Sequence, residues 1–201
     1  MITIVDYGMG NLGSIQNMFK RIGVPAQVTG DIAAVQKARK ILLPGVGAFD
    51  SAMQRINESG LRTVLDHKAL QERIPIMGIC LGMQLLTRSS EEGQLPGLGW
   101  LPATTRRFAH DMGLKVPHMG WNVVTSARES ALTEGLAVDS RYYFVHSYFV
   151  QTDNPVNRLQ TTHYGITFDA VVGHGNLYGA QFHPEKSHKF GMRFLANFAR
   201  I

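Results

Sequence analysis

The sequence predicts an α/β fold: a mainly parallel sheet with helices on both faces, and extra antiparallel strands in the C-terminal half. Two observations predict it. Through residue 86, short apolar runs alternate with stretches whose apolar residues recur at helical spacing, which favours parallel strands joined by helices. After Gly93, frequent glycines and prolines break the chain into short pieces typical of antiparallel or mixed β structure.

The first half contains four predicted strands and five predicted helices. Apolar residues at Leu12, Ile15, Met18, Phe19 and Ile22 lie on one helical face, and Gly23 ends that helix. The predicted strands are 2–6, 26–29, 41–43 and 76–79, and the predicted helices are 12–22, 32–39, 48–56, 61–71 and 83–86. The Gly-rich turn after the first strand lacks a complete G-x-G-x-x-G, so a tight turn is favoured over nucleotide binding.

The second half is predicted to consist mainly of short strands closed by a helix. The strands are expected near 99–101, 122–125, 142–145, 159–162, 170–174 and 177–181, and the helix at 192–201. We find no internal repeat, low-complexity segment or linker, and therefore expect one domain spanning residues 1–201.

Composition indicates an ordinary globular protein of the cytoplasm. Of the 201 residues, 44% are hydrophobic and 17% charged, and a single cysteine excludes an internal disulfide framework. No basic leader and no apolar run of about 18 residues is present, so neither secretion nor membrane insertion is expected. Although the net charge is +5, the Lys and Arg residues are scattered, which argues against a nucleic-acid partner.

The lone cysteine lies in the stretch Gly78-Ile79-Cys80-Leu81-Gly82, between a buried strand and a helix. This is the G-x-nucleophile-x-G elbow with cysteine in place of serine, and its glycines permit a sharp turn. The N-terminus of the following helix favours a thiolate. The sequence therefore indicates a nucleophilic cysteine. The alternative is a buried structural cysteine, a common environment for free thiols.

A cysteine nucleophile needs a base, and His183 is the leading candidate. Glu185 follows two residues later at the end of a predicted strand, where an extended chain would turn both side chains to the same side. The other seven histidines remain open at this point; they are residues 67, 110, 118, 146, 163, 174 and 188. With one cysteine and no close histidine spacing, we expect no zinc site.

The stretches 78–84 (GICLGMQ) and 181–185 (QFHPE) together resemble the class I (triad) glutamine amidotransferases, and the resemblance covers nearly the whole chain. It implies a flavodoxin-like domain without cofactor or metal. Cys80 would be the nucleophile, His183 the base and acid, and Glu185 the carboxylate that orients His183.

The substrate implied is glutamine, whose hydrolysis passes through an oxyanion. The N–H of Leu81, directly after the nucleophile, is the natural first donor to that oxyanion. The second is expected from the glycine-rich loop at 44–47, from Val46 or Gly47. For the two ends of glutamine the resemblance points to five residues: Gly47, Gln84, Glu92, Ser147 and Tyr148.

Four further stretches, 6–12, 43–49, 117–122 and 144–148, resemble the branch of this family that supplies ammonia for histidine biosynthesis. The implied partner is a (β/α)8-barrel cyclase in a heterodimer, with Trp121, Asn122 and Lys186 as candidate interface residues. Three alternatives stay open. The chain could serve another aminating synthase, such as one that aminates sugars, or it could be a stand-alone cysteine hydrolase or a non-catalytic binding module.

Overall fold

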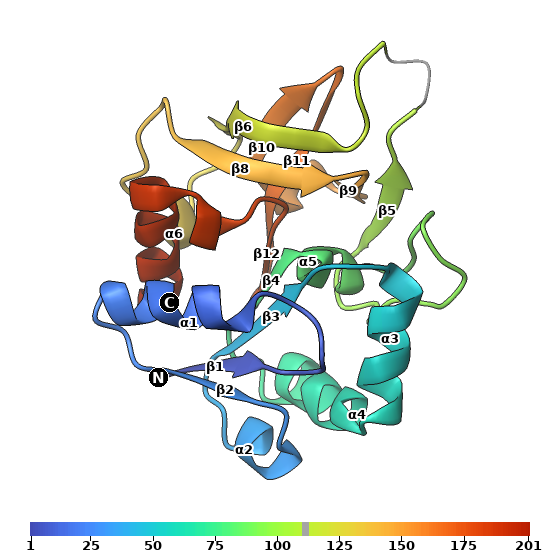
Figure 1. Ribbon diagram of the computed structural model, residues 1–201, viewed down its shortest axis with the longest axis vertical. Coiled ribbons are helices and arrows are strands. Elements are labelled where there is room, and N and C mark those ends of the chain that lie inside the picture. Colours follow the sequence, from blue (N-terminus) through green and yellow to red (C-terminus); the bar gives the residue numbers. More distant parts are fainter. Residues whose placement is uncertain (110–112) are drawn as a thin grey trace.

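The computed structural model describes residues 1–109 and 113–201 and is organised around an eight-stranded sheet in the order β2-β1-β3-β4-β12-β11-β10-β7 (Figure 1). The first five strands pair in parallel; they are β1 (Ile2–Val5), β2 (Ala26–Thr29), β3 (Ile41–Gly45), β4 (Ile76–Cys80) and β12 (Leu177–Ala180). The remaining three extend the sheet in antiparallel fashion; they are β11 (Ile166–His174), β10 (Arg158–Tyr164) and β7 (Thr125–Ser126). The parallel order 2-1-3-4 is that of a flavodoxin-like sheet, which confirms the predicted fold class.

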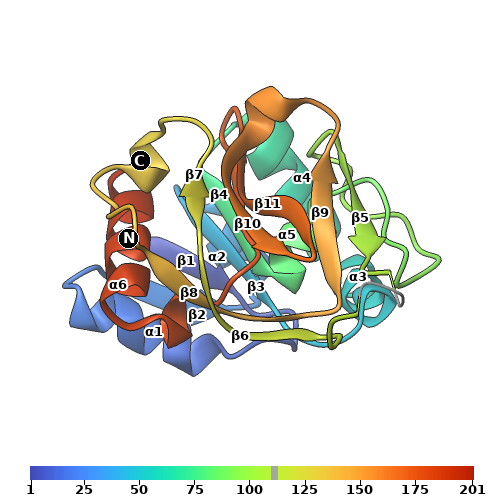
Figure 2. The ribbon, with the colours of Figure 1, turned by 90° about the horizontal axis from the view of Figure 1, so that it is seen from above.

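Helices cover both faces of the sheet (Figures 1 and 2). On one face lie α1 (Leu12–Arg21) and α6 (His188–Arg200), which contact each other. The other face carries α2 (Ile32–Gln36), α3 (Phe49–Glu58), α4 (Leu61–Asp66) and α5 (Leu81–Leu85). Strand side chains alternate between the two cores: Ile4 and Leu42 pack on the α1/α6 side, and Val5 and Leu43 on the other. This alternation is the period of two that a sheet buried on both faces requires.

Two two-stranded antiparallel sheets stand beside the main sheet. One pairs β5 (Ala103–Arg107) with β9 (Tyr148–Thr152), and the other pairs β6 (His118–Val123) with β8 (Arg141–His146). Strand β8 also reaches the segment after β12 through an isolated bridge between Tyr143 and His183. The β6–β8 pair therefore lies over the carboxyl edge of the parallel strands, where a site in this kind of sheet is expected.

The predicted strand at 99–101 is wrong, and strands β5 and β9 were not predicted. Gly99 adopts φ +70°, which interrupts an extended chain. The amides of Leu98 and Leu101 instead donate to the carbonyls of Leu85 and Leu86, so this loop caps the end of α5. Smaller differences concern the ends of elements. Helix α2 ends at 36 rather than 39, α5 spans 81–85 rather than 83–86, and the strand predicted at 122–125 is divided between the end of β6 and β7. The last helix begins at 188 rather than 192, and the segment predicted as a helix over 61–71 continues after α4 as a π-helical turn, His67–Gln71.

Three neighbouring strands bring the chemically interesting segments together. In the register of β3 and β4, Gly45 lies opposite Cys80, and in the register of β4 and β12, Ile79 lies opposite Ala180. The glycine-rich loop after β3, the cysteine after β4 and the histidine segment after β12 therefore leave the sheet side by side. Residues more than a hundred positions apart meet because their strands are adjacent and parallel.

Candidate active site

The backbone at Cys80 makes the turn from β4 into α5 with φ 54° and ψ −111°. A non-glycine residue in this conformation carries on the order of 1–3 kcal/mol of strain. The flanking glycines explain how the turn closes. A Cβ on Gly82 would lie 1.8 Å from the carbonyl oxygen of Leu43, and one on Gly78 would lie 2.4 Å from the carbonyl oxygen of Gly82. The elbow therefore depends on glycine at both positions.

We expect Gly82→Ala to destabilise the protein by at least about 3 kcal/mol, because its new methyl group would overlap backbone rather than a movable side chain. Gly13→Ala in α1 is the matched control, since a Cβ there meets nothing within 4 Å. Denaturant unfolding of both variants measures the difference. Equal midpoints for the two variants would contradict the close-approach explanation of the elbow.

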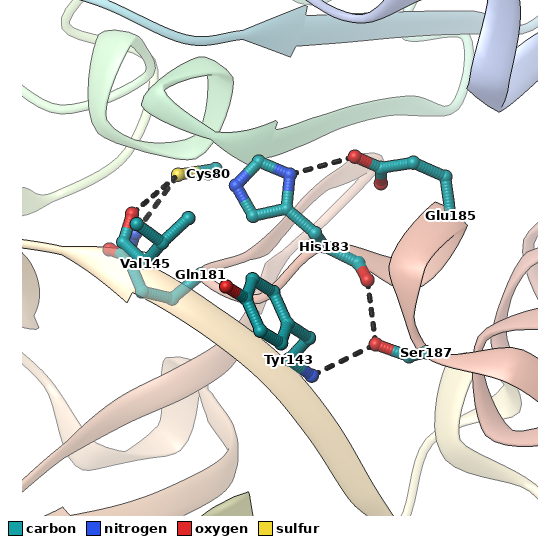
Figure 3. A network of polar contacts seen from close by, with 7 residues as sticks. All are labelled: Cys80, Tyr143, Val145, Gln181, His183, Glu185 and Ser187. Atoms are coloured by element: carbon teal, nitrogen blue, oxygen red, sulfur yellow. Dashed lines mark hydrogen bonds and ion pairs between the residues drawn. The ribbon is translucent and has the colours of Figure 1, made fainter. Parts of the chain in front are cut away.

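Cys80, His183 and Glu185 form a row in Figure 3. Nδ1 of His183 is 2.8 Å from Oε1 of Glu185, and the two side chains are 2% and 1% exposed. The other ring nitrogen, Nε2, is buried and faces the sulfur (Figure 3). Burial lowers the pKa of His183, but hydrogen bonding and charge interactions with Cys80 and Glu185 outweigh it and raise that pKa to about 10. The arrangement favours a charged His183 imidazolium at neutral pH.

The contact between His183 and Glu185 arises differently from the extended-strand geometry expected from sequence. His183 precedes a short 3₁₀ turn, Pro184–Lys186, which curls the carboxylate back onto the imidazole. The backbone of His183 is fixed from two sides, since its amide donates to the carbonyl of Tyr143 at 2.9 Å and its carbonyl accepts from the Ser187 hydroxyl at 2.6 Å. Ser187 Oγ in turn accepts from the Tyr143 amide (Figure 3). The imidazole is therefore held by main-chain contacts as well as by Glu185.

The sulfur has two further polar neighbours that sequence reasoning did not assign. The side-chain amide of Gln181 donates to Sγ at 3.7 Å, and the carbonyl of Val145 lies 4.0 Å from it. Gln84 Nε2 donates to the side-chain oxygen of Gln181 at 3.2 Å and to the Tyr148 carbonyl at 3.0 Å. Because both donations fix the amide, Oε1 of Gln84 is the end left to accept hydrogen bonds. Gln84 is buried rather than on a helix surface.

A cavity of about 350 Å³ opens over the sulfur. It brings together nine of the residues singled out from sequence and adds three that were not. The nine are Val46, Gly47, Cys80, Leu81, Gln84, Glu92, Ser147, Tyr148 and His183, and the additions are Pro117, Val145 and His146. The cavity is large enough for a free amino acid.

The glycine-rich loop after β3 is fixed by its neighbours. The buried hydroxyl of Tyr7 donates to the carbonyl of Pro44 at 2.5 Å, and burial raises the pKa of that hydroxyl. Gly47 adopts φ +103°, and a Cβ there would lie 2.7 Å from the Met9 methyl group. Val46 is 43% exposed at the cavity mouth. The loop thus lines the same cavity as the sulfur, in a conformation that only glycine adopts easily at position 47.

Glu92 reaches the cavity from the loop after α5. Its Oε2 accepts the N–H of Phe49 at the start of α3, at 3.1 Å. Half-burial raises the pKa of this carboxyl, only partly opposed by the Phe49 hydrogen bond. A carboxylate held in this way is a suitable partner for a ligand ammonium group.

The three candidate interface residues lie outside the cavity. Trp121 is 46% exposed and stacks on His188, and Nζ of Lys186 lies 5.5 Å from the centre of the Tyr143 ring. Asn122 differs, because its side chain is bonded within the chain to His118, the His163 carbonyl and the Val123 amide. The structure therefore leaves Trp121 and Lys186 available at the surface, whereas the Asn122 amide is already satisfied.

The residues missed from sequence were near motifs that had been noticed. Gln181 opens the QFHPE stretch, and His146 and Val145 precede Ser147, but no local rule gave these positions a role. Of the other histidines, only His146 lines the cavity within residues 1–109 and 113–201; His110 lies outside the described residues. Over the same described ranges, no group of three or more His, Cys, Asp or Glu could hold a metal ion, and no helix is long and apolar enough to cross a membrane.

Comparison with known proteins places this geometry in a family. The profile of the family described as Glutamine amidotransferase class-I matches residues 3–201. The imidazole glycerol phosphate synthase subunit HisH 2 of Methanococcus maripaludis is 52% identical over 200 residues, covering 100% of this chain and 99% of that protein. The HisH subunit of Bdellovibrio bacteriovorus is 49% identical over 204 residues, with full coverage of both chains.

Solved structures agree on the fold. A crystal structure described as a glutamine amidotransferase superposes with a TM-score of 0.78 at 18% identity and covers 100% of both chains. The structure of PurLQS from Thermotoga maritima gives a TM-score of 0.73 at 18% identity and covers 99% of this chain and 97% of that one. The sequence matches, extending over essentially the whole length, establish that this chain belongs to the class-I glutamine amidotransferase family.

Proposed function

We infer that this chain is the glutaminase subunit of an imidazole glycerol phosphate synthase. It hydrolyses glutamine to glutamate and ammonia and passes the ammonia to a cyclase subunit in histidine biosynthesis. The observation that carries this function is the full-length identity of 49–52% to HisH subunits. The row of Cys80, His183 and Glu185 at the base of a cavity supplies chemistry that such a subunit needs.

In the proposed acylation step, the Cys80 thiolate attacks the side-chain carboxamide carbon of glutamine. The C–N bond breaks as the tetrahedral intermediate collapses to a γ-glutamyl thioester. The His183 imidazolium donates its Nε2 proton to the leaving nitrogen, so that ammonia departs rather than an amide anion. Glu185 stabilises the charged imidazole through Nδ1, and the high pKa of His183 keeps the proton available.

The tetrahedral intermediate carries an oxyanion that requires preorganised donors. The N–H of Leu81 begins α5 and has no partner within its own helix. A second donor comes from the loop after β3, from Val46 or Gly47. Each such donor contributes about 3–4 kcal/mol to lowering the barrier. Water deprotonated by His183 then attacks the thioester and releases glutamate, which returns the cysteine to its thiolate.

The two ends of glutamine need opposite charges around them. Glu92 is proposed to pair with the ammonium group, and Oε1 of Gln84, unused within the chain, accepts from the substrate. Backbone N–H groups at Ser147 and Tyr148 are proposed to meet the carboxylate, and Gly47 permits close approach of the loop. These assignments explain why polar groups on four separate segments converge on one cavity.

We expect Glu92→Gln to raise KM for glutamine roughly tenfold or more, because a charge-assisted hydrogen bond to the ammonium group is lost. The change should fall mainly on KM rather than kcat. Since the Glu92 pKa is raised, wild-type KM should increase as pH falls through that value, whereas the variant's KM should stay flat. Glu91→Gln is the control, because its partners are Arg106 and Arg107. The same KM and pH profile for Glu92→Gln and wild type would rule out the ion pair.

We propose that the partner is a (β/α)8-barrel cyclase, which forms a heterodimer with this chain. Ammonia released into bulk water would be protonated and lost as a nucleophile, so its use requires a docked acceptor site. Trp121 and Lys186, exposed beside the segment that carries His183, are proposed to contact the cyclase, with Asn122 supporting the same strand. The relatives are subunits of a synthase, which supports a partner subunit for this chain.

Glutamate release measured with and without the purified cyclase subunit and its nucleotide ligand tests this function. We expect release to be strongly stimulated by the cyclase with its ligand, and ammonia to reach the product without exchange with bulk. A rate of glutamine hydrolysis that the cyclase does not change would contradict the assignment to histidine biosynthesis but would leave the glutaminase chemistry in place. Absence of hydrolysis in the complex would contradict the glutaminase itself.

A further inference from the structure

Two histidines form a buried hydrogen-bonded pair beside the cavity. His118 on β6 and His146 on β8 face each other in the strand register, and Nδ1 of His118 lies 3.0 Å from Nε2 of His146. Their side chains belong to residues that are 3% and 6% exposed. The triad chemistry makes no use of either imidazole. A buried imidazole pair is costly unless every nitrogen has a hydrogen-bond partner. The partners at the two ends of the pair therefore determine which nitrogens carry the protons.

Those end partners fix the direction of every hydrogen bond. At one end, Nδ1 of His146 lies 2.8 Å from the carbonyl oxygen of Tyr148, which can only accept, so Nδ1 carries the proton. At the other end, the amide nitrogen of Asn122 donates to the His163 carbonyl and, at 3.3 Å, to Nε2 of His118. Nε2 of His118 is therefore an acceptor, and its Nδ1–H donates to His146. The partners at each end thus lead independently to the same tautomer, with the proton on Nδ1 of both rings.

The surroundings keep both rings neutral. His118 stacks between Phe144 and Tyr164, and Phe168 packs against both histidines. Burial lowers the pKa of His118 to about 4 and that of His146 to about 3, and the mutual proximity of the two histidines and of His183 further lowers the latter. Two neutral imidazoles, each with its proton on Nδ1, therefore form a continuous chain of hydrogen bonds in which each donor points from Asn122 toward the Tyr148 carbonyl.

We propose that His118 and His146 are positioning residues that hold the Ser147–Tyr148 backbone in place to receive the carboxylate of glutamine. The chain of donors Asn122, His118 and His146 ends on the Tyr148 carbonyl, which also accepts from Gln84. This inference rests on the proposed function, which assigns glutamine to that backbone. It adds that the segment is aligned from β6, the strand that also carries Trp121 at the proposed docking face.

The position of Tyr148 explains why such support is needed. Ser147 lies between β8 and β9, where the chain leaves the β6–β8 sheet and enters the β5–β9 sheet. A carboxylate-binding peptide there must keep its N–H groups aimed at the cavity. Two donors meet on one carbonyl, from His146 and Gln84, and the bond from the His146 side chain closes a local ring around Ser147 that limits rotation of the two peptides between His146 and Tyr148. Loss of the His146 donor should therefore weaken glutamine binding before it slows the chemical step.

The test compares glutaminase kinetics of the complex for His146→Leu, His118→Leu and His146→Asn. We expect His146→Leu to raise KM for glutamine roughly tenfold, the effect of losing one net hydrogen bond, with kcat changed less than about threefold. His118→Leu should give a smaller increase in KM. Asparagine places an N–H near the position of Nδ1, so His146→Asn should recover most of the wild-type KM.

Phe168→Leu is the control for lost packing, because Phe168 contacts both imidazoles but makes no hydrogen bond to the chain of donors. A KM of His146→Leu within twofold of that of Phe168→Leu would overturn the proposal. A second readout does not depend on glutamine: nitrogen NMR of ¹⁵N-histidine-labelled protein should show Nδ1 protonated and Nε2 unprotonated on both rings. The opposite tautomer on His146 would also overturn it. If wild-type complex hydrolyses no glutamine, the proposed function fails first, and the tautomer measurement still distinguishes the two failures.

Discussion

Replacement of Cys80 by serine is expected to abolish glutamine-dependent synthesis, with glutamate release falling by at least about 10³-fold. A serine hydroxyl is a much weaker acid and a weaker nucleophile than a thiol, so the same imidazole activates it far less. Synthesis by the same complex from added ammonium salt should be unchanged, because the acceptor site belongs to the partner. The measurement is product formation with each nitrogen source.

Three outcomes distinguish the possible explanations. Loss of activity with glutamine alone supports a nucleophile at Cys80. Loss with both nitrogen sources would indicate that the substitution disrupts assembly, and thermal unfolding of the isolated chain checks that the elbow still folds. Retention of glutamine-dependent activity, or growth without histidine at limiting ammonium as good as wild type, would contradict the triad proposal.

Glu185→Gln is expected to lower glutamate release by on the order of 10²–10⁴-fold with little change in KM. The glutamine amide can present an N–H to Nδ1 of His183, which would place the proton on Nε2 and remove the charge that supports the imidazolium. The pKa of His183 should then fall, since Glu185 is one of the groups that raise it. A smaller imidazolium fraction at a given pH should in turn make the Cys80 sulfur less reactive.

The rate of Cys80 alkylation by iodoacetamide as a function of pH measures the reactivity of this sulfur directly, because the chain contains one cysteine. The midpoint of the alkylation profile of Glu185→Gln should lie at a higher pH than that of the wild type. Glu129→Gln, at an exposed loop position, serves as the control. An unchanged profile together with unchanged turnover would show that Glu185 does not govern the imidazole.

The parallel half of the fold was predictable because its signals are local. Each buried strand is a short apolar run, and helix α1 shows the helical spacing of its apolar residues directly. Strands β5 and β9 were missed because their sequences, Ala103–Arg107 and Tyr148–Thr152, do not show a continuous apolar or strictly alternating pattern. Such strands form through pairing with each other, which no local pattern records.

The site divides in the same way. The elbow around Cys80 and the pairing of His183 with Glu185 are encoded in short motifs, although the pairing depends on a 3₁₀ turn rather than an extended strand. The contacts of Gln181 and His146 depend on side chains from separate strands meeting at one edge. Sequence patterns gave no signal for the donor chain that ends at Tyr148. Its histidines lie on two strands, β6 and β8, and only the register of these strands determines which side chains face each other.

The most direct test is rapid-quench mass spectrometry of the complex during turnover of glutamine. We expect the peptide carrying Cys80 to gain the mass of one γ-glutamyl group, the gain to accumulate within the first turnover, and the Cys80→Ala variant to show none. Turnover without any adduct on that peptide, or with the γ-glutamyl group on another residue, would contradict thioester catalysis by this cysteine.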